Sequence, residues 1–208
     1  MRAPTDADVR RVFDRMADRY DDQMQAWERR LFPGSREWAV AQARGHVVEI
    51  AAGTGLNLPL YADDVTVVGI ELSERMLDLA RRRLATAGLG DRMELRQGDA
   101  QRLDLPDGVA DTVVSTFTMC TIPDPLAAAR EASRVLKPGG RFVLAEHGPA
   151  SNPVLRAGMR LVEPLFLRFA ADHLTRDPRT FLEEAGFHIE SVSRTSRGVG
   201  FRVLAVRP

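Results

Sequence analysis

The stretch Val47-Val48-Glu49-Ile50-Ala51-Ala52-Gly53-Thr54-Gly55-Leu56-Asn57 decides the fold of this chain. Its apolar start predicts a buried strand, its two glycines predict a tight turn, and the residues after them predict the start of a helix. A second apolar run, 65–70, leads directly into the acid Glu71. Strand, glycine turn, helix, strand and acid in this order are typical of α/β proteins that hold a nucleoside-containing cofactor.

The composition is that of one soluble globular domain over residues 1–208, with 44% hydrophobic and 28% charged residues. The 29 basic and 29 acidic residues balance, which argues against nucleic-acid binding because that needs an excess of positive charge. Cys120 is the single cysteine, which excludes an internal disulfide and a cysteine-based zinc site. We therefore expect no metal.

The chain shows no targeting or membrane-spanning segment. Residues 1–20 alternate charged with apolar residues, unlike a signal peptide, and no apolar run approaches the ~18 residues that span a bilayer. Together with the cysteine content, this predicts a cytoplasmic protein without a transmembrane segment.

Strands and helices alternate through the middle of the chain and then change pattern. We expect strands at 47–51, 65–70, 93–97, 109–116 and 141–146, separated by helices at 56–61, 73–87 and 125–136. The final strands, 189–194 and 200–206, have no helix between them and should pair antiparallel. The predicted fold class is α/β, with a seven-stranded, mostly parallel sheet, an antiparallel C-terminal strand pair and helices on both faces.

Two helical segments fall outside this alternation. Residues 1–44 should form an N-terminal lid, with one helix ending near Tyr20 and a second over 23–44 that breaks at Pro33-Gly34. Residues 149–176 should form a cap insertion, which contains a helix over 153–171 and is followed by a short helix at 177–185.

The glycine turn discriminates between cofactors. A dinucleotide fingerprint requires a third glycine, but position 58 is Leu, and the chain has no Tyr-x-x-x-Lys pair for hydride transfer. S-adenosylmethionine fits better because it carries no phosphate and needs only a turn that approaches its amino-acid tail. The helix that follows the turn would present N–H groups to the carboxylate of that tail.

Carboxylates at the ends of three strands have the chemistry to hold such a cofactor. Glu49 can bond the ammonium of the tail, directly or through water; Glu71 can accept from both ribose hydroxyls; and Asp99 can bond the adenine amino group. Leu72 and Met76 can cover the ring. The remaining residues that we expect around the cofactor are Tyr20, Ala51, Gly53, Gly55, Asn57, Ala100 and Thr116.

These motifs resemble those of the class I methyltransferases that depend on S-adenosylmethionine, a Rossmann-like family. The resemblance rests on Glu49 to Gly55, on Glu71, on Gly98-Asp99-Ala100 and on 134–140 (RVLKPGG), in the order of the family. Ala51 stands where the commonest family pattern has its first glycine. The resemblance covers about residues 12–148 and implies a methyl-transferring enzyme.

Finer resemblances lie outside the cofactor motifs. Residues 13–21 (FDRMADRYD) are similar to the entry segment of ubiquinone/menaquinone C-methyltransferases, in which the tyrosine, here Tyr20, lies over the methionine end of the cofactor. Residues 116–121 (TFTMCT), Glu146-His147 and 173–176 (HLTR) resemble bacterial phosphatidylethanolamine N-methyltransferases and microsomal thiol S-methyltransferases. The membrane-anchoring N-terminal helix of the thiol enzymes is not found here.

His147 is the candidate catalytic residue. It follows the fifth predicted strand at the carboxyl edge of the sheet, where open α/β folds bind ligands, and it can act as a general base or contact the substrate. Thr118 and His173 are further candidates for substrate contact. Cys120 is better placed as a pocket wall than as a nucleophile, because methyl transfer needs no covalent intermediate.

The acceptor stays open at this level. We expect a small, lipophilic acceptor with a thiol, amine, phenol or quinone-like carbon. A phospholipid head-group N-methyltransferase at the membrane surface and a non-catalytic module that binds S-adenosylmethionine are alternatives. The apolar face at 153–171 fits either a helix packed on the core, which we favour, or a lid that accepts a lipophilic substrate or touches a membrane surface. The protein should be a monomer or a homodimer.

Overall fold

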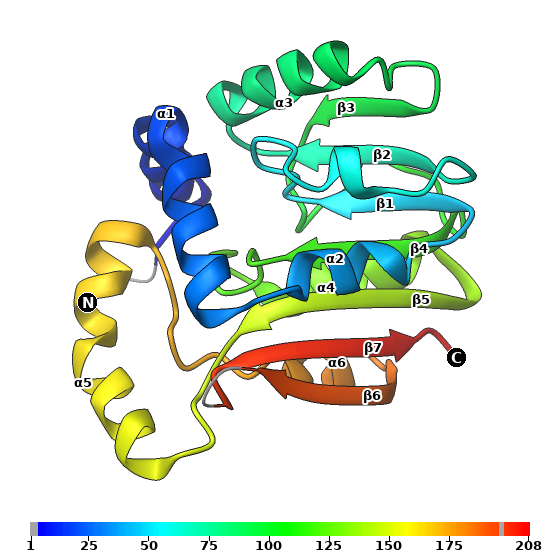
Figure 1. The fold of residues 1–208 in the computed structure, drawn as a ribbon. Helices are drawn as coiled ribbons and strands as arrows, with labels where there is room; N and C mark the ends of the chain where they lie inside the picture. The colour runs from blue at the N-terminus through cyan, green and yellow to red at the C-terminus, as the bar shows by residue number, and fades with distance from the viewer. Residues whose placement is uncertain (1–3, 196–197) are drawn as a thin grey trace.

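A seven-stranded sheet forms the centre of the computed structural model, which describes residues 4–195 and 198–208 (Figure 1). The strand order is β3-β2-β1-β4-β5-β7-β6, and β7 pairs antiparallel with both β5 and β6. The predicted fold class is therefore confirmed. The strands are β1 (His46–Ile50), β2 (Thr66–Glu71), β3 (Met93–Gln97), β4 (Ala110–Thr116), β5 (Leu136–His147), β6 (His188–Thr195) and β7 (Gly200–Val206).

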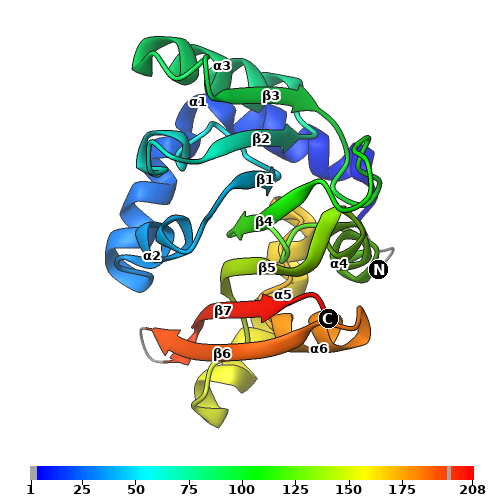
Figure 2. The ribbon, with the colours of Figure 1, turned by 90° about the vertical axis from the view of Figure 1, so that its right-hand side faces the viewer.

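Helices cover both faces of the sheet because the central strands are apolar on both sides (Figure 2). Val47 packs in the cluster on one face and its neighbour Val48 in the cluster on the other, as the alternation of a strand requires. The first face is covered by α2 (Ser35–Ala41), η1 (Leu58–Leu60) and α3 (Glu74–Ala87), and the second by α4 (Pro125–Val135) and α6 (Pro178–Glu184).

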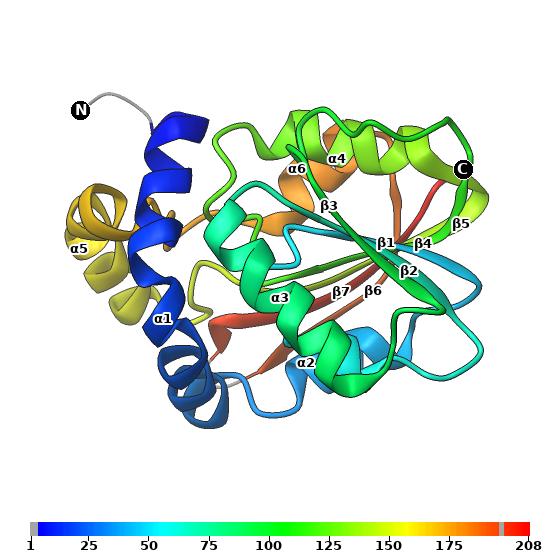
Figure 3. The ribbon, with the colours of Figure 1, turned by 90° about the horizontal axis from the view of Figure 1, so that it is seen from above.

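Two longer helices lie at one end of the sheet instead of on a face (Figures 1 and 3). They are α1 (Asp6–Leu31) and α5 (Pro153–Ala170), which contact each other beyond the carboxyl ends of the parallel strands. Among the described residues, no helix is both long enough and apolar enough to cross a bilayer. Residues 1–3 of the predicted lid lie outside the described residues.

Several predicted boundaries are correct for the predicted reason. The Ser73 hydroxyl caps α3 by accepting from the Met76 N–H at 3.2 Å, and Gly88 ends the helix with φ of 67°. The break at Pro33-Gly34 separates α1 from α2, with Gly34 in the left-handed region.

Three predicted boundaries are wrong. The expected end near Tyr20 does not occur, because no proline or glycine interrupts α1 before Leu31. The helix expected at 56–61 is reduced to the 3₁₀ turn η1. Strand β5 begins at Leu136, before the expected start at 141: Leu136 pairs with Ala110 and Arg141 with Thr112, so the residues between them bulge out of register.

Candidate functional site

A cavity opens at the carboxyl ends of β1, β2, β3 and β4, beneath α1. It encloses about 590 Å³ of space, including its open mouth. The residues that line it are Asp6, Val9, Phe13, Tyr20, Ala51, Gly53, Glu71, Leu72, Met76, Gly98, Asp99, Ala100, Gln101, Phe117, Thr118, Thr121, Ile122 and Pro123.

The turn after β1 takes a left-handed backbone at three residues, Ala51, Gly53 and Gly55, with φ of 49°, 60° and 78°. Gly55 has a second reason to be glycine, because a Cβ there would lie 2.7 Å from Leu58 Cδ1. Gly53 faces the cavity. Its N–H donates to Glu71 Oε2 at 2.8 Å, so β2 holds the turn that follows β1.

Glu71 is buried at the end of β2, and its second oxygen, Oε1, accepts from the Ser73 N–H at 2.8 Å. Burial raises the pKa of Glu71, while the backbone N–H groups of Ser73 and Gly53 oppose that shift. Each carboxylate oxygen has a further lone pair that can accept from a ribose hydroxyl.

Asp99 lies on the same wall of the cavity, where its Oδ1 accepts from the Gln101 N–H at 2.9 Å. The apolar neighbours Leu72, Met76 and Ala100 line the space beside it. Two strand-end carboxylates with an apolar wall beside them fit the ribose and adenine of S-adenosylmethionine. The hydrogen-bond acceptors and the apolar wall of this cavity therefore fit the cofactor.

Helix α1 closes the cavity from above. Tyr20 lines it with its ring edge-on to Phe13, and burial raises the pKa of the Tyr20 phenol, which keeps it a neutral hydrogen-bond donor. Acidic residues of α1 bind the helix to residues at the rim of the cavity. Asp14 accepts from Ser73 Oγ at 2.5 Å, and Asp21 accepts from Thr54 Oγ1 at 2.6 Å and pairs with Arg83.

Behind the cavity wall lies a buried polar network around Glu49. Glu49 Oε1 accepts from Asn57 Nδ2 and Oε2 from the Tyr61 hydroxyl, both at 2.9 Å. Arg36 continues the network by donating to Asn57 Oδ1 at 2.7 Å and to Thr116 Oγ1 at 3.1 Å. Burial raises the pKa of Glu49 to about 7, against the opposing effects of Tyr61, Arg36 and Asn57. A second acid, Glu28 of α1, forms an ion pair with Arg36.

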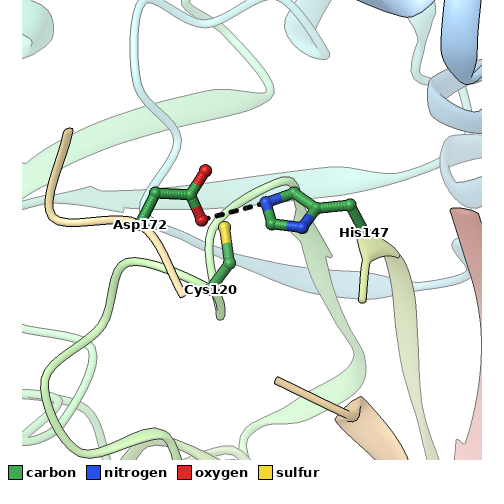
Figure 4. Close-up of side chains that lie close together, drawn as sticks. All are labelled: Cys120, His147 and Asp172. Atoms are coloured by element: carbon green, nitrogen blue, oxygen red, sulfur yellow. Dashed lines mark ion pairs between the residues drawn. The ribbon is translucent and has the colours of Figure 1, made fainter. Parts of the chain in front are cut away.

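His147 lies at the end of β5, with its Nε2 3.0 Å from Asp172 Oδ1 (Figure 4). Asp172 comes from the segment directly after α5, and the Cys120 thiol, from the loop after β4, interacts with the same carboxylate. Burial alone would lower the pKa of His147, but the carboxylates of Asp172 and Glu146 raise it above its ordinary value. The imidazole is therefore a stronger base than a free histidine.

The loop after β4 joins this pair to the cavity. Phe117, Thr118 and Thr121 of the loop line the cavity, and Cys120 lies between them in the chain. Glu146 fixes the loop by accepting from the Thr118 N–H at 3.0 Å and from the Met119 N–H at 3.1 Å. Next to Asp172, the His173 N–H donates to the Cys120 carbonyl at 3.0 Å, which fixes the spacing of the two segments.

Arg176 adds a further tie, because its Nη1 donates to the carbonyls of Met119 and Ile122, both at 2.6 Å. Burial lowers the pKa of His173, and the Arg176 charge lowers it further. Both residues belong to the segment that carries Asp172. The β4 loop, the end of β5 and the segment after α5 therefore form one rigid corner of the site.

Cys120, His147 and Asp172 are also the described residues that could hold a metal ion, since their ligand atoms lie within 4.8 Å of one another. Sulfur, nitrogen and oxygen donors of this kind can bind zinc. Without an ion, His147 and Asp172 form an ion pair and the thiol contacts the carboxylate, but Asp172 Oδ1 is buried and makes no hydrogen bond.

The predicted cofactor residues fall into two groups. Eight predicted cofactor residues line the cavity or its mouth: Tyr20, Ala51, Gly53, Glu71, Leu72, Met76, Asp99 and Ala100. Thr118, predicted to contact the substrate, lines it too. Glu49, Gly55, Asn57 and Thr116 lie behind the wall, where they shape it. His147 and His173 lie at the adjoining corner. The role of each residue toward a ligand stays a prediction.

Sequence reasoning missed several residues that the fold brings to the site. Asp172 directly precedes the motif at 173–176, so one more residue of that motif would have found it. Phe117 lines the cavity with an unusual φ of 57°. Arg36 and Tyr61 carried no local signal, because their partners lie in distant parts of the chain.

Comparison with known proteins agrees with this geometry. Residues 48–144 match a family model described as a methyltransferase domain. A phosphatidylethanolamine N-methyltransferase of Cereibacter sphaeroides is 41% identical over 158 residues, 71% of this chain and 76% of that protein. A demethylmenaquinone methyltransferase of Symbiobacterium thermophilum is 32% identical over 167 residues, 76% of this chain and 66% of that protein.

Solved structures share the fold. A crystal structure of an S-adenosylmethionine-dependent methyltransferase from Aquifex aeolicus superposes with a TM-score of 0.62 at 19% identity, covering 83% of this chain and 89% of that one. The strand order, the cavity at the carboxyl edge and the sequence relatives lead to the same assignment. The chain belongs to the class I S-adenosylmethionine-dependent methyltransferases.

Proposed function

We propose that this methyltransferase acts on a small, lipophilic acceptor that loses a proton, such as a thiol, a phenol or a quinone-like carbon, and that His147 accepts that proton. The ion pair between His147 and Asp172, beside the loop that lines the cavity, carries the proposal. A buried carboxylate that raises the pKa of an imidazole is a recurring way to position a general base.

In this proposal, the residues of the site have separate roles in binding, positioning and proton transfer. When bound, S-adenosylmethionine supplies an electrophilic methyl group. Glu71 and Asp99 hold the nucleoside, and Tyr20 and α1 keep water out. The loop around Thr118 positions the acceptor in line with the methyl group, and most of the rate enhancement comes from that alignment. His147, paired with Asp172, takes the proton that the acceptor loses.

A second candidate function is N-methylation of a phospholipid head group. The Cereibacter sphaeroides relative is named for that activity, and several apolar side chains of α5 are exposed beside the site. A neutral amine needs no general base, so the two candidates differ in their dependence on His147.

The test is an acceptor screen that measures release of S-adenosylhomocysteine with thiols, phenols, quinols, free amines and phosphatidylethanolamine. The proposal expects turnover with at least one deprotonating class, lost in His147→Asn. Turnover with amines alone, unaffected by His147→Asn, would favour the second candidate. Cofactor binding without turnover in any class would reject both.

Replacement of Glu71 should weaken cofactor binding. Glu71→Ala removes the acceptor that we assign to the ribose, and we expect a loss of about 1–3 kcal/mol by titration calorimetry with S-adenosylmethionine. Because Glu71 also holds Gly53, Glu71→Gln serves as the milder variant, and thermal melting checks its fold. Glu190→Ala, at an exposed position on β6, is the matched control. Unchanged affinity in both Glu71 variants would remove the residue from the cofactor site.

A further inference from the structure

Helix α5 exposes an unusual amount of apolar surface. None of its residues is buried. Leu161 is 82% exposed, Leu165 58% and Phe169 64%. Exposed apolar side chains clustered on one element mark an interaction surface, whereas single ones are common on any protein. The exposed large apolar residues of α5 are Val154, Leu155, Leu161, Val162, Leu165 and Phe169.

The apolar side of α5 points away from the protein. Phe166 and Glu163 are half-buried on the inner side, where Glu163 accepts from the Thr175 hydroxyl at 2.7 Å. Leu161, Leu165 and Phe169 recur every four residues and therefore share one side, opposite to that of Glu163. A helix that covers a soluble protein normally has the reverse orientation, with its polar side in solvent.

The charges on α5 indicate what covers this surface. Arg160 and Arg168 are its exposed charged residues. Arg168 follows Leu165 by three positions and so lies beside it on the helix surface. The one acid of the helix, Glu163, is occupied with Thr175. An apolar strip with basic residues at its side is complementary to an anionic lipid surface, where the apolar residues enter the acyl region and the arginines meet phosphates.

We propose that the outward side of α5, formed by the six exposed apolar residues with Arg160 and Arg168, docks on the surface of an anionic phospholipid bilayer. The helix lies flat on the membrane in this arrangement, since no described helix can cross it. The bilayer is the occupant that satisfies both the apolar strip and the positive charge.

Docking would bring the active site to the lipid. Helix α5 ends at Ala170, and Asp172, the partner of His147, follows two residues later. The helix also contacts α1, which roofs the cavity. An acceptor dissolved in the bilayer would therefore reach the site without crossing bulk water. This deepens the proposed function, because it names where the acceptor lies, yet vesicle binding needs neither cofactor nor acceptor and can be tested alone.

The experiment is co-sedimentation of the full chain with vesicles of phosphatidylcholine, with and without phosphatidylglycerol. We expect binding to the anionic vesicles that decreases with added salt. The affinity of the double variant Leu161→Glu/Leu165→Glu for anionic vesicles should be at least about tenfold lower. The variant loses two leucines that would be buried in the lipid, and the anionic surface repels each new acid. Leu60→Glu, at an exposed apolar position on η1, is the matched control and should bind like the wild type.

Two further measurements keep the test decisive. Turnover of a water-soluble acceptor should be unchanged in the double variant, which shows that the fold and the proposed function survive. The proposal would be overturned if the wild-type protein does not bind anionic vesicles, or if the double variant binds them as well as the wild type. So would sedimentation equilibrium that finds a wild-type dimer dissociated by the double variant, with no vesicle binding, because α5 would then be covered by a second copy.

Discussion

At the residue scale, the backbone of the turn after β1 is the feature that most constrains the site. Ala51 has φ of 49°, a left-handed conformation that costs a residue with a side chain roughly 1–2 kcal/mol. It is held there because the Ala52 N–H donates to the Ile70 carbonyl at 2.9 Å and the Gly53 N–H donates to Glu71. This geometry explains why the family prefers glycine at the position of Ala51.

Substitution of Ala51 by glycine should therefore stabilise the protein. Relief of the strain outweighs the greater flexibility of glycine in the unfolded chain by about 0.5–1 kcal/mol, which should raise the midpoint of thermal unfolding by a few degrees. Ala52→Gly is the control, since Ala52 is buried and outside the left-handed region, and it should lower the midpoint. Equal losses in both variants would show that Ala51 is not strained.

At the element scale, three separate segments meet at His147. The end of β5 supplies the imidazole, the segment after α5 supplies Asp172, and the loop after β4 supplies the cavity wall. Glu146, the residue before His147, fixes that loop through two backbone N–H groups. A change in any of these segments would move His147, the proposed base, relative to the cavity.

This convergence predicts the pH dependence of methyl transfer to an acceptor that must lose a proton. The rate should rise with pH as His147 loses its own proton, with a midpoint above the ordinary 6.5 because Asp172 raises the pKa. Asp172→Asn should move the midpoint to lower pH and reduce the maximal rate, while His147→Asn should lower kcat about a hundredfold or more. His46→Asn, at the opposite edge of the sheet, is the control. An unshifted midpoint in Asp172→Asn would argue against the pairing.

At the scale of the whole molecule, a buried polar network joins elements that are distant in the sequence. Glu28 of α1, Arg36 of α2, Glu49 of β1, Asn57 before η1 and Thr116 of β4 form one hydrogen-bonded chain. The network lies directly behind the cofactor cavity, so it couples the position of α1 to the floor of the site. It contains one carboxyl group that titrates near neutral pH.

That carboxyl group should make stability depend on pH. With a pKa of about 7 in the folded state and an ordinary value of 4.5, Glu49 holds a proton in the folded protein over a range where the unfolded chain has lost it. Its contribution is full below pH 4.5 and is lost as the pH rises through 7, on the order of 3 kcal/mol in total. Glu49→Gln, compared with Glu190→Gln, should flatten this dependence in denaturant unfolding between pH 4.5 and 8. An identical pH dependence in both variants would contradict the assignment.

Local patterns predicted most of the elements and the cofactor half of the site. Ser73 and Gly88 marked the ends of α3, and Glu71 and Asp99 marked the strand ends that line the cavity, because capping and strand periodicity act over a few residues. The expected end near Tyr20 was wrong, because no proline or glycine interrupts α1 there, and contacts of α1 with the cavity rim add to the stability of one long helix.

The sequence by itself determined the order of strands and helices, the glycine turn and the carboxylates at the strand ends, since each depends on neighbouring residues. Only the tertiary structure decided that Asp172 pairs with His147, that Arg36 joins Glu28 to Asn57, and that the apolar side of α5 faces outward. A helical period shows that a helix has an apolar side but not whether that side faces the core or the solvent. The local sequence around a charged residue does not identify a partner that is distant in the chain. Both are fixed by how the elements pack, which is why the partner of His147 and the direction of the apolar side of α5 emerged only from the fold.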